Sequence, residues 1–337
     1  MKIMDTILTG ITTTGTPHIG NFVGAIRPAI QSSQQADSRS FYFLADYHAL
    51  VKCHDPKVLR QSTLEVAATW LALGLDTDRS IFYRQTDIPE IPELTWILTC
   101  MTAKGLMNRA HAYKAAVQDN ETLKAKDPDK GINMGLFCYP VLMAADILMF
   151  KANKVPVGKD QVQHLEMARD IAMRFNHAFG ETFVLPEAVT SESTAVLQGL
   201  DGRKMSKSYN NTIPLFAPAK RLRKLIMKIK TNSQGPDEPK DPDRCTLFQV
   251  YRAFATSEET AALRDRYARG IAWGEMKQIL FEYLDQLLET PRTRYAELIA
   301  NPDHIENILI EGARKAREFS RPFLAEIRQA VGVQAVR

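Results

Sequence analysis

Short apolar runs alternate with segments of helical periodicity through the first half of this chain. The expected strands are 6–11, 40–46, 81–84 and 155–158. Helices are expected over 21–27 and 59–73, more than one across 92–117, and one over 135–151 that begins near Tyr139-Pro140. Strands that alternate with helices are typical of parallel sheets whose two faces are covered. The pattern predicts an α/β fold with a doubly wound, parallel, Rossmann-like sheet.

The pattern changes in the second half of the chain. After residue 213 the strand signals fade and helical periodicity continues to the end, interrupted by a loop over 231–244. A length of 337 residues is enough for two domains of ordinary size. We therefore expect a sheet domain over 1–213 and an all-helical domain over 214–337. The charged stretch 119–131 lacks apolar periodicity and is expected to be a mobile loop.

Composition excludes several classes of protein. The chain has no apolar run near the length of a membrane span, and its N-terminus lacks the pattern of a signal peptide. Its four cysteines are scattered without close pairs, which suggests neither a zinc site nor a disulfide framework. We expect a cytoplasmic protein without a structural metal. A net charge of +4 does not by itself indicate a nucleic-acid partner.

The segment from Gly10 to Asn21 is rich in small residues and leads into a predicted helix. Backbone N–H groups at the start of a helix favour phosphate, and glycine lets the backbone approach it. No Gly-Lys-Ser/Thr follows, so the segment is not a Walker loop. His18 could donate a hydrogen bond to a phosphoryl oxygen during displacement. Taken alone, the segment could equally be a capped turn with an incidental histidine.

Two lysines occupy a second candidate loop, Arg203-Lys204-Met205-Ser206-Lys207-Ser208, which follows Gly202. A lysine presents a compact charge on a flexible stem, which suits a leaving pyrophosphate that must be held most strongly in the transition state. A Lys-x-x-Lys pattern by itself is more often a solvated basic loop. Its occurrence together with the His18 segment favours the functional interpretation.

In this order, Thr16-Pro17-His18-Ile19-Gly20-Asn21 and the lysine loop resemble the HIGH and KMSKS elements of class I aminoacyl-tRNA synthetases. The chain further resembles the tryptophanyl-tRNA synthetases almost from end to end, and it does so most specifically in three segments. These are Ala45-Asp46-Tyr47-His48-Ala49, Tyr139-Pro140-Val141-Leu142-Met143-Ala144-Ala145-Asp146-Ile147-Leu148 and Val155-Pro156-Val157-Gly158-Lys159-Asp160-Gln161. The last two identify a subfamily, whereas the HIGH and KMSKS elements identify only the class.

Met143 and Asp146 lie three residues apart, so they share one face of the predicted helix. The resemblance places that face against the substrate ring, where Asp146 would accept the indole N–H. The tyrosyl enzymes typically have glutamine at the position of Met143, and a thioether offers little to a phenolic hydroxyl. The resemblance also implies that Tyr139 and Gln161 hold the substrate amino group and that His48 lines the pocket.

The resemblance implies an ATP site as well. His18, Lys204, Lys207 and Lys114 would act on the phosphates, and ATP would contact Thr12, Thr13, Thr14, Gly20, Asn21, Gly158, Lys159, Asp160, Val196, Lys204, Met205, Ser206, Lys207 and Ser208. Two positions depart from the family. Thr12 and Thr13 replace a Gln-Pro pair, which leaves the turn less preorganised, and Lys159 replaces a glutamate.

The implied partners are L-tryptophan, ATP with Mg²⁺ and tRNA(Trp), the last through a helical domain that recognises the anticodon. The resemblance further implies a homodimer whose interface lies on the N-terminal domain. The amphipathic segment 220–230 carries cations that either face solvent or contact the tRNA backbone. The alternatives are a tyrosyl-tRNA synthetase, a small-molecule adenylyltransferase and a synthetase-like regulatory binding protein.

Overall fold

The computed structural model describes residues 4–34, 38–158, 161–190 and 196–334. Within them five strands form one parallel sheet in the order β3-β2-β1-β4-β5. The strands are β1 (Asp5–Thr12), β2 (Ser38–Ala45), β3 (Ile81–Arg84), β4 (Lys154–Pro156) and β5 (Glu187–Val189). This is the strand order of a Rossmann-like sheet, so the predicted fold class is confirmed. The strand order reverses between β1 and β4, which meet at Ile7 and Lys154.

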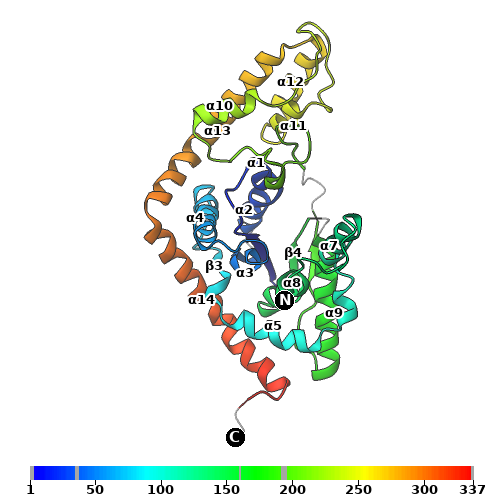
Figure 1. Ribbon diagram of the computed structural model, residues 1–337. Coiled ribbons are helices and arrows are strands. Elements are labelled where there is room, and N and C mark those ends of the chain that lie inside the picture. Colours follow the sequence, from blue (N-terminus) through cyan, green and yellow to red (C-terminus); the bar gives the residue numbers. More distant parts are fainter. Residues whose placement is uncertain (1–3, 35–37, 159–160, 191–195, 335–337) are drawn as a thin grey trace.

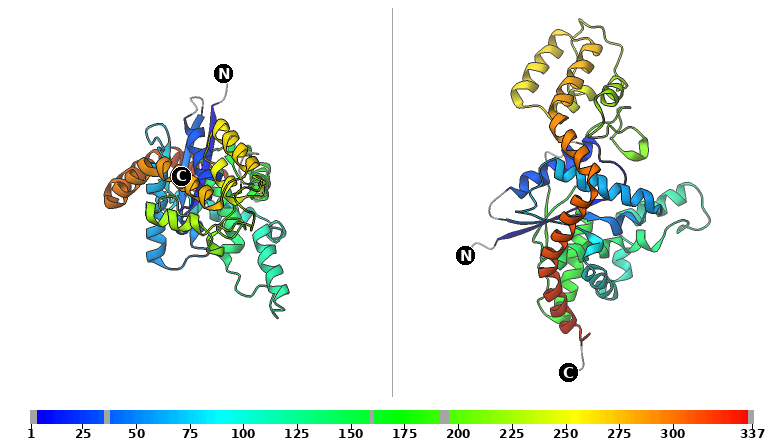
Figure 2. Two further views of the ribbon diagram at one scale, coloured as in Figure 1. Left: turned by 90° about the horizontal axis from the view of Figure 1, so that it is seen from above. Right: turned by 90° about the vertical axis from the view of Figure 1, so that its left-hand side faces the viewer.

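Helices cover both faces of the sheet (Figures 1 and 2). Those of the first half are α1 (Ile19–Asn21), the π-helical turn η1 (Phe22–Ile26), α2 (Arg27–Ser33), α3 (Asp46–Ala49), α4 (Pro56–Ala72), the 3-10 turn η2 (Gln85–Asp87), α5 (Glu90–Met101), α6 (Lys104–Met107), α7 (His111–Thr122), α8 (Met134–Met149) and α9 (Val162–Phe179). Because both faces are covered, β2 is buried without interruption from Ser40 to Ala45.

Helix starts follow from local chemistry. The Asp55 carboxylate caps α4 by accepting from the Lys57 N–H at 2.8 Å, and Pro56 stands at the first position, where its missing N–H costs nothing. Asn133 caps α8 in the same way, by accepting from the Leu136 N–H at 2.8 Å. Helix α8 therefore begins well before Pro140, which lies inside it.

One predicted boundary is wrong. The expected loop over 119–131 overlaps α7, which continues through Thr122. None of the residues of helix α7 is buried. An exposed helix needs no apolar stripe, so a charged stretch cannot be distinguished from a loop by periodicity. The expected mobility of this segment stays a prediction.

The second half is helical, as predicted. It contains the 3-10 turn η4 (Lys207–Tyr209), α10 (Ala219–Met227), α11 (Thr246–Arg252), α12 (Ser257–Arg269), α13 (Trp273–Ala300) and α14 (Pro302–Ala330). Helices α10 to α12 and the first half of α13 pack around Leu222, Phe248, Tyr267 and Leu280, and this core also includes Ile19 of α1. In Figure 1 this helical body lies above α1 and α2.

The last two helices lead from that body back to the sheet. Helix α13 runs down the molecule, and α14 continues along β3 and past α5 (Figures 1 and 2). Gly312 of α14 lies so close to β3 that a Cβ atom there would be 1.7 Å from the Phe82 carbonyl oxygen. Ion pairs secure the contact, with Arg317 to Glu90 at 2.7 Å and Arg84 to Glu306 at 2.8 Å. A division of the chain at 213/214 stays a prediction, and residues 302–330 lie on the sheet.

Candidate active site

A cavity of about 610 Å³ opens at the carboxyl ends of β1, β2 and β4, and its lining includes Thr12, Ala45 and Pro156 from these strands. Its volume is in the range of small-molecule sites. The position is the point where the strand order reverses, which is where doubly wound sheets bind their ligands. The fold alone therefore makes this cavity the candidate ligand site.

All five residues predicted to hold the amino acid line this one cavity: His48, Tyr139, Met143, Asp146 and Gln161. Met143 and Asp146 both face it from α8, as their spacing predicted. His48 comes from α3, directly after β2, and Gln161 precedes α9. His48 and Gln161 therefore lie in the segments that follow β2 and β4, at the carboxyl edge of the sheet.

The cavity wall requires a glycine at its β1 side. A Cβ atom on Gly10 would lie 2.5 Å from Cζ of Phe43, which projects from β2. Both residues line the cavity. The missing side chain lets an aromatic ring form this wall, which provides an apolar surface for a planar ligand.

Asp146 is the buried charge of the cavity, with 1% of the residue exposed. Its Oδ2 lies 2.8 Å from Nε2 of His48, and its Oδ1 accepts from Nε2 of Gln85 at 2.7 Å. Burial raises the pKa of Asp146, and the hydrogen bonds from His48 and Gln85 oppose that rise. The carboxylate is therefore held in place at the cavity wall by one group on each oxygen.

Two partners of these residues were not predicted from the sequence. Gln85 is fully buried in η2 and reaches Asp146 from behind the cavity. His164 of α9 lines the cavity, and its Nε2 pairs with the Tyr139 hydroxyl. The only available signal for Gln85 was its place after the strand 81–84, where the carboxyl end of the sheet gathers functional groups.

The first turn follows β1 and is held by α4. Gly15 has a φ of +68°, a conformation that favours glycine, and its N–H donates to the Ser62 hydroxyl at 2.8 Å. The Thr16 hydroxyl donates to the Glu65 carboxylate at 2.6 Å. Neither Ser62 nor Glu65 was predicted as a site residue. Their bonds order the turn despite the Thr12-Thr13 departure.

The three threonines of this turn are placed differently. Thr12 and Thr14 line the cavity, while the Thr13 side chain is fully buried, and its hydroxyl has no hydrogen-bond partner among the described residues. The structure therefore brings two of the three predicted residues to the cavity.

His18 is the N-cap of α1 and is 7% exposed. Its Nδ1 accepts from the Asn21 N–H at 3.3 Å, while Oδ1 of Asn21 accepts from the His18 N–H at 3.1 Å. Burial, aided by the positive charge of Lys207, lowers the pKa of His18 to about 4. Since Nδ1 is an acceptor in a neutral ring, the proton lies on Nε2, which can donate to a ligand.

Gly20 brings the first motif against the second. A Cβ atom there would lie 3.0 Å from Nδ1 of His18 and 3.5 Å from the sulfur of Met205. Met205 is buried, and its N–H donates to the Leu197 carbonyl at 2.8 Å. The structure thus places His18, Gly20 and Met205 side by side.

Asn211 holds the lysine loop in shape. It is 2% exposed, its Oδ1 accepts from the Ser206 N–H at 2.8 Å, and its Nδ2 donates to Asp201 at 2.7 Å and to the Lys204 carbonyl at 3.1 Å. A Cβ on Gly199 would lie 2.4 Å from this side chain, so the loop also needs glycine there. Asn211 was not predicted from the sequence.

Lys207 connects the lysine loop to the first turn. Its ammonium donates to the carbonyl oxygens of Gly15, at 2.8 Å, and of Thr14. The residue as a whole is exposed, but its ammonium is surrounded by the turn, and this loss of solvent lowers the pKa of Lys207 to about 8. The two motifs therefore meet at the mouth of the cavity.

Several predicted site residues do not line the cavity. Lys114 is exposed on α7 and is not among the described residues that line the cavity, although its neighbours His111, Ala112 and Ala115 are. Val196 and Lys204 are exposed, and Ser208 lies in the exposed turn η4. Gly158 forms the turn that accepts the Gln161 N–H at 2.9 Å. Lys159 and Asp160 lie outside the described residues, and the roles of all these residues stay predictions.

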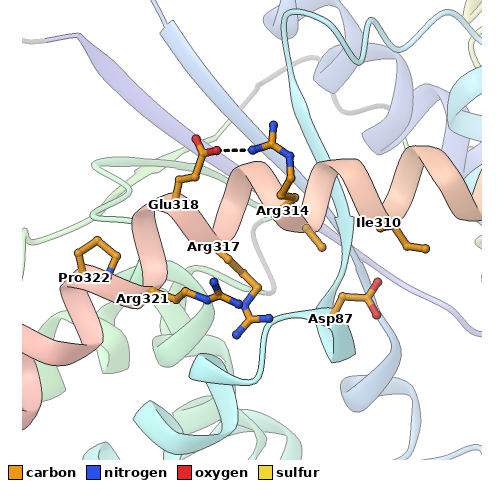
Figure 3. Close-up of a pocket in the computed structure, with 8 residues that line it drawn as sticks. Asp87, Ile310, Arg314, Arg317, Glu318, Arg321 and Pro322 are labelled. Carbon is orange, nitrogen blue, oxygen red and sulfur yellow. Dashed lines mark hydrogen bonds and ion pairs between the residues drawn. The ribbon is translucent and has the colours of Figure 1, made fainter.

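A second hollow, of about 630 Å³, lies between α14 and η2 (Figure 3). Its lining includes Asp87, Arg317 and Arg321, and Arg314 pairs with Glu318 as the dashed line marks. Arg317 is paired with Glu90. These charges belong to the contact between α14 and the sheet domain, and none of the predicted site residues lines this hollow.

The sequence model of a known family, tRNA synthetases class I (W and Y), matches residues 4–289. A tryptophan–tRNA ligase of Pseudomonas aeruginosa is 64% identical over 334 residues, which are 98% of this chain and 74% of the relative. One of Neisseria meningitidis serogroup A is 58% identical over 331 residues, which are 98% of each chain.

Solved structures agree with these relatives. The tryptophanyl-tRNA synthetase of Campylobacter jejuni, complexed with ADP and tryptophan, superposes with a TM-score of 0.87 at 41% identity. The match covers 97% of this chain and 99% of that one. The tryptophanyl-tRNA synthetase of Mycoplasma pneumoniae superposes with a TM-score of 0.81 at 27% identity, over 98% of this chain and 99% of that one.

Proposed function

This chain belongs to the class I tRNA synthetase family of the tryptophan and tyrosine enzymes, and we propose that it is a tryptophan–tRNA ligase. Relatives with that name match it over nearly its whole length. The observation in the structure that supports tryptophan is the buried carboxylate of Asp146 beside the thioether of Met143 at one cavity wall. A carboxylate accepts an indole N–H, which is a donor that would be costly to bury unpaired.

The reaction has two steps. A carboxylate oxygen of tryptophan attacks the α-phosphorus of ATP, the bond to the bridging oxygen breaks, and tryptophanyl-AMP and pyrophosphate form. A hydroxyl of the terminal ribose of tRNA(Trp) then attacks the acyl carbon, and AMP leaves. The chain needs no covalent nucleophile for either step, because positioning and charge stabilisation supply the catalysis.

The protein groups proposed for the first step come from the segment that begins α1 and from the lysine loop. Nε2–H of neutral His18 donates to a phosphoryl oxygen, and Lys204 and Lys207 neutralise the phosphates as pyrophosphate leaves. Lys207 is supported by its contact with Thr14 and Gly15, because that contact brings the lysine loop to the turn that lines the cavity.

Magnesium is proposed to arrive with ATP. Within the described residues, no group of three or more His, Cys, Asp or Glu side chains is placed to hold a metal ion. Mg²⁺ commonly binds through substrate phosphates with few protein ligands, and we propose that mode of binding here. It would neutralise phosphate charge beside the two lysines.

The transfer RNA is proposed to contact the helical body. On α10 the basic residues Lys220, Arg221, Arg223 and Lys224 are all exposed, while Leu222 and Ile226 are buried. This supports a solvated, positively charged face that is open to a phosphate backbone. A steep loss of tRNA affinity with salt, reduced by reversing two of these charges, would support the contact.

Because translation requires this activity, we propose a cytoplasmic location. No helix of the described part is both long and apolar enough to cross a membrane.

A homodimer is proposed through α5, on the sheet domain. Trp96 of α5 is 68% exposed, and tryptophan is enriched at the centres of protein interfaces. The variant Trp96→Asp should run as a monomer in light-scattering chromatography while the unaltered chain runs as a dimer. Leu123→Asp is the matched control, because Leu123 is 79% exposed at the end of α7. A dimer that survives Trp96→Asp would exclude this face.

The test of the proposed function is ATP–pyrophosphate exchange that depends on an amino acid. Tryptophan should stimulate exchange, and tyrosine should not. Stronger stimulation by tyrosine would make the chain a tyrosyl-tRNA synthetase. Stimulation by neither amino acid would favour a synthetase-like binding protein. Charging of tRNA(Trp) with labelled tryptophan then tests the second step.

A further inference from the structure

Gln85 lies behind the cavity and touches the carboxylate of the site without lining the cavity itself. It is fully buried in η2, directly after β3. Its Nε2 donates to Oδ1 of Asp146 at 2.7 Å. The residue is absent from the lining, whereas Asp146 is part of it. Gln85 therefore acts on a ligand through the aspartate and not by direct contact.

The orientation of the Gln85 amide is fixed by a second hydrogen bond. Its Oε1 accepts from the Tyr47 N–H at 3.2 Å, an N–H that also donates to Asp46 at 3.0 Å. A flipped amide would place its oxygen against the Asp146 carboxylate and its NH₂ group against the Tyr47 N–H. Both contacts would be unfavourable, so the amide presents a donor to Asp146.

The turn that carries Gln85 is itself held on both sides. The Thr86 hydroxyl donates to Oδ2 of Asp46 at 2.7 Å, and Arg84 pairs with Asp87 at 3.0 Å and with Glu306 of α14 at 2.8 Å. Gln85 is thus placed by neighbours on α3 and α14 that lie outside the cavity. A residue so fixed can hold the Asp146 carboxylate in one rotation.

From this geometry we propose that Gln85 is the positioning residue that makes the site select a ring N–H. With one oxygen of Asp146 held by Gln85 and the other by His48, the carboxylate stays an acceptor aimed at the cavity. A ligand ring that lacks an N–H would leave this buried acceptor without its third partner. The inference rests on the proposed function, because tryptophan is the ligand whose ring carries that N–H.

Binding of two ligands tests it. Isothermal titration would compare the dissociation constants of tryptophan and 3-(3-benzothienyl)alanine, in which sulfur replaces the ring N–H. The unaltered chain should prefer tryptophan, and Gln85→Met, which keeps the length but removes the donor, should reduce that preference by about tenfold. ATP affinity should change less than about twofold. Gln249→Met is the control, because it removes a comparable amide bond, to the Asp243 carbonyl, within the helical body.

A second variant guards against misfolding. Gln85→Glu keeps the shape but places two carboxyl groups at hydrogen-bond distance, so they must share a proton. Tryptophan affinity should then be near normal at low pH and fall as the pH rises and that proton is lost. The other titratable groups near this pair are His48, Tyr83 and Asp46, and all three are unaltered in both chains.

The outcomes separate the two proposals. An unchanged preference in Gln85→Met, or a tryptophan affinity of Gln85→Glu that does not vary with pH more than that of the unaltered chain, would overturn the role of Gln85. An unaltered chain that binds both ligands equally would also overturn it. A chain that binds tryptophan selectively but does not catalyse exchange would contradict the ligase function and leave the role of Gln85 supported.

Discussion

The Lys207 ammonium donates to the carbonyl oxygen of Gly15 at 2.8 Å, across 192 residues of sequence. The φ of Gly15 is +68°, a backbone conformation that favours glycine, and Cδ of Lys207 packs at ordinary contact distance from this residue. The first turn and the lysine loop are therefore one structure at the mouth of the cavity. Their separate sequence motifs act as a single unit.

Lys207→Ala should slow adenylate formation by about 10²–10³-fold, the usual effect of removing one donor that acts in the transition state. The KM for ATP should change far less, because the proposed contact strengthens mainly as charge develops on the leaving group. Initial rates of ATP–pyrophosphate exchange give both constants. Lys220→Ala is the control, since this lysine is exposed on α10. A proportional rise in KM without a loss of kcat would contradict the transition-state role.

His18 should stay neutral through physiological pH. Its pKa is lowered to about 4, whereas an unfolded histidine titrates near 6.5, so folding excludes the proton. The contribution of neutral His18 to the free energy of unfolding is therefore complete above about pH 6.5 and is lost as the pH falls toward 4. Thermal unfolding from pH 7 to pH 4.5 should show a smaller loss in His18→Asn than in the unaltered chain. Equal slopes would show that His18 titrates normally.

Met143→Gln should weaken the preference for tryptophan over tyrosine. An amide at this cavity wall can bond a phenolic hydroxyl, which the thioether of Met143 cannot do well. The ratio of kcat/KM for the two amino acids in the exchange assay should fall by at least about tenfold. Met134→Gln, on an exposed residue at the start of the same helix, is the control. A preserved ratio would mean that Met143 does not face the ring.

Asn211→Asp should disable the lysine loop without affecting the amino acid. The carboxylate would lose the donors to Asp201 and the Lys204 carbonyl and would stand beside Asp201, whose pKa is already lowered to about 2 by its hydrogen bonds. We expect the kcat of exchange to fall about tenfold with little change in the KM for tryptophan. Asn232→Asp, at an exposed residue of the loop 231–244, provides the comparison. A normal kcat would show that the loop is held by other contacts.

Gly312→Ala should destabilise the chain strongly. The added methyl would lie 1.7 Å from the Phe82 carbonyl oxygen, so helix α14 would have to move away from β3, which we expect to cost at least about 3 kcal/mol. Gly274→Ala is a matched control, since nothing lies within 4 Å of that position on α13 and alanine favours a helix. The midpoint of thermal unfolding should fall by several degrees in the first variant and not in the second.

The parts of the fold that depend on local patterns could be predicted from the sequence. The strand 81–84 is found where it was expected, because a short apolar run between polar turns allows few other assignments. His18 and Lys207 could be predicted for a different reason, since their two segments together resemble the HIGH and KMSKS elements of class I aminoacyl-tRNA synthetases. The structure brings them together.

The supporting residues could not be predicted. Gln85 and Ser62 act on protein groups that lie 61 and 47 residues away in the sequence, and Asn211 acts on Ser206 within its own loop. Of these three residues, Gln85 alone had a signal in the sequence, its place after the strand 81–84. The docking of α14 was equally hidden, because an amphipathic stripe predicts burial but not the partner. Gly312 carried the only local signal of a close backbone approach.

The contact between Gly312 and β3 also has a consequence for the order in which this protein can be completed during translation. Strand β3 is the outermost strand on its side of the described sheet, and α14 is the element that covers it. A ribosome must synthesise the chain through α14 before that edge is shielded, and uncovered edge strands recruit other chains. Chains stopped at residue 300 should therefore aggregate, as light scattering would detect, while chains that include α14 should not.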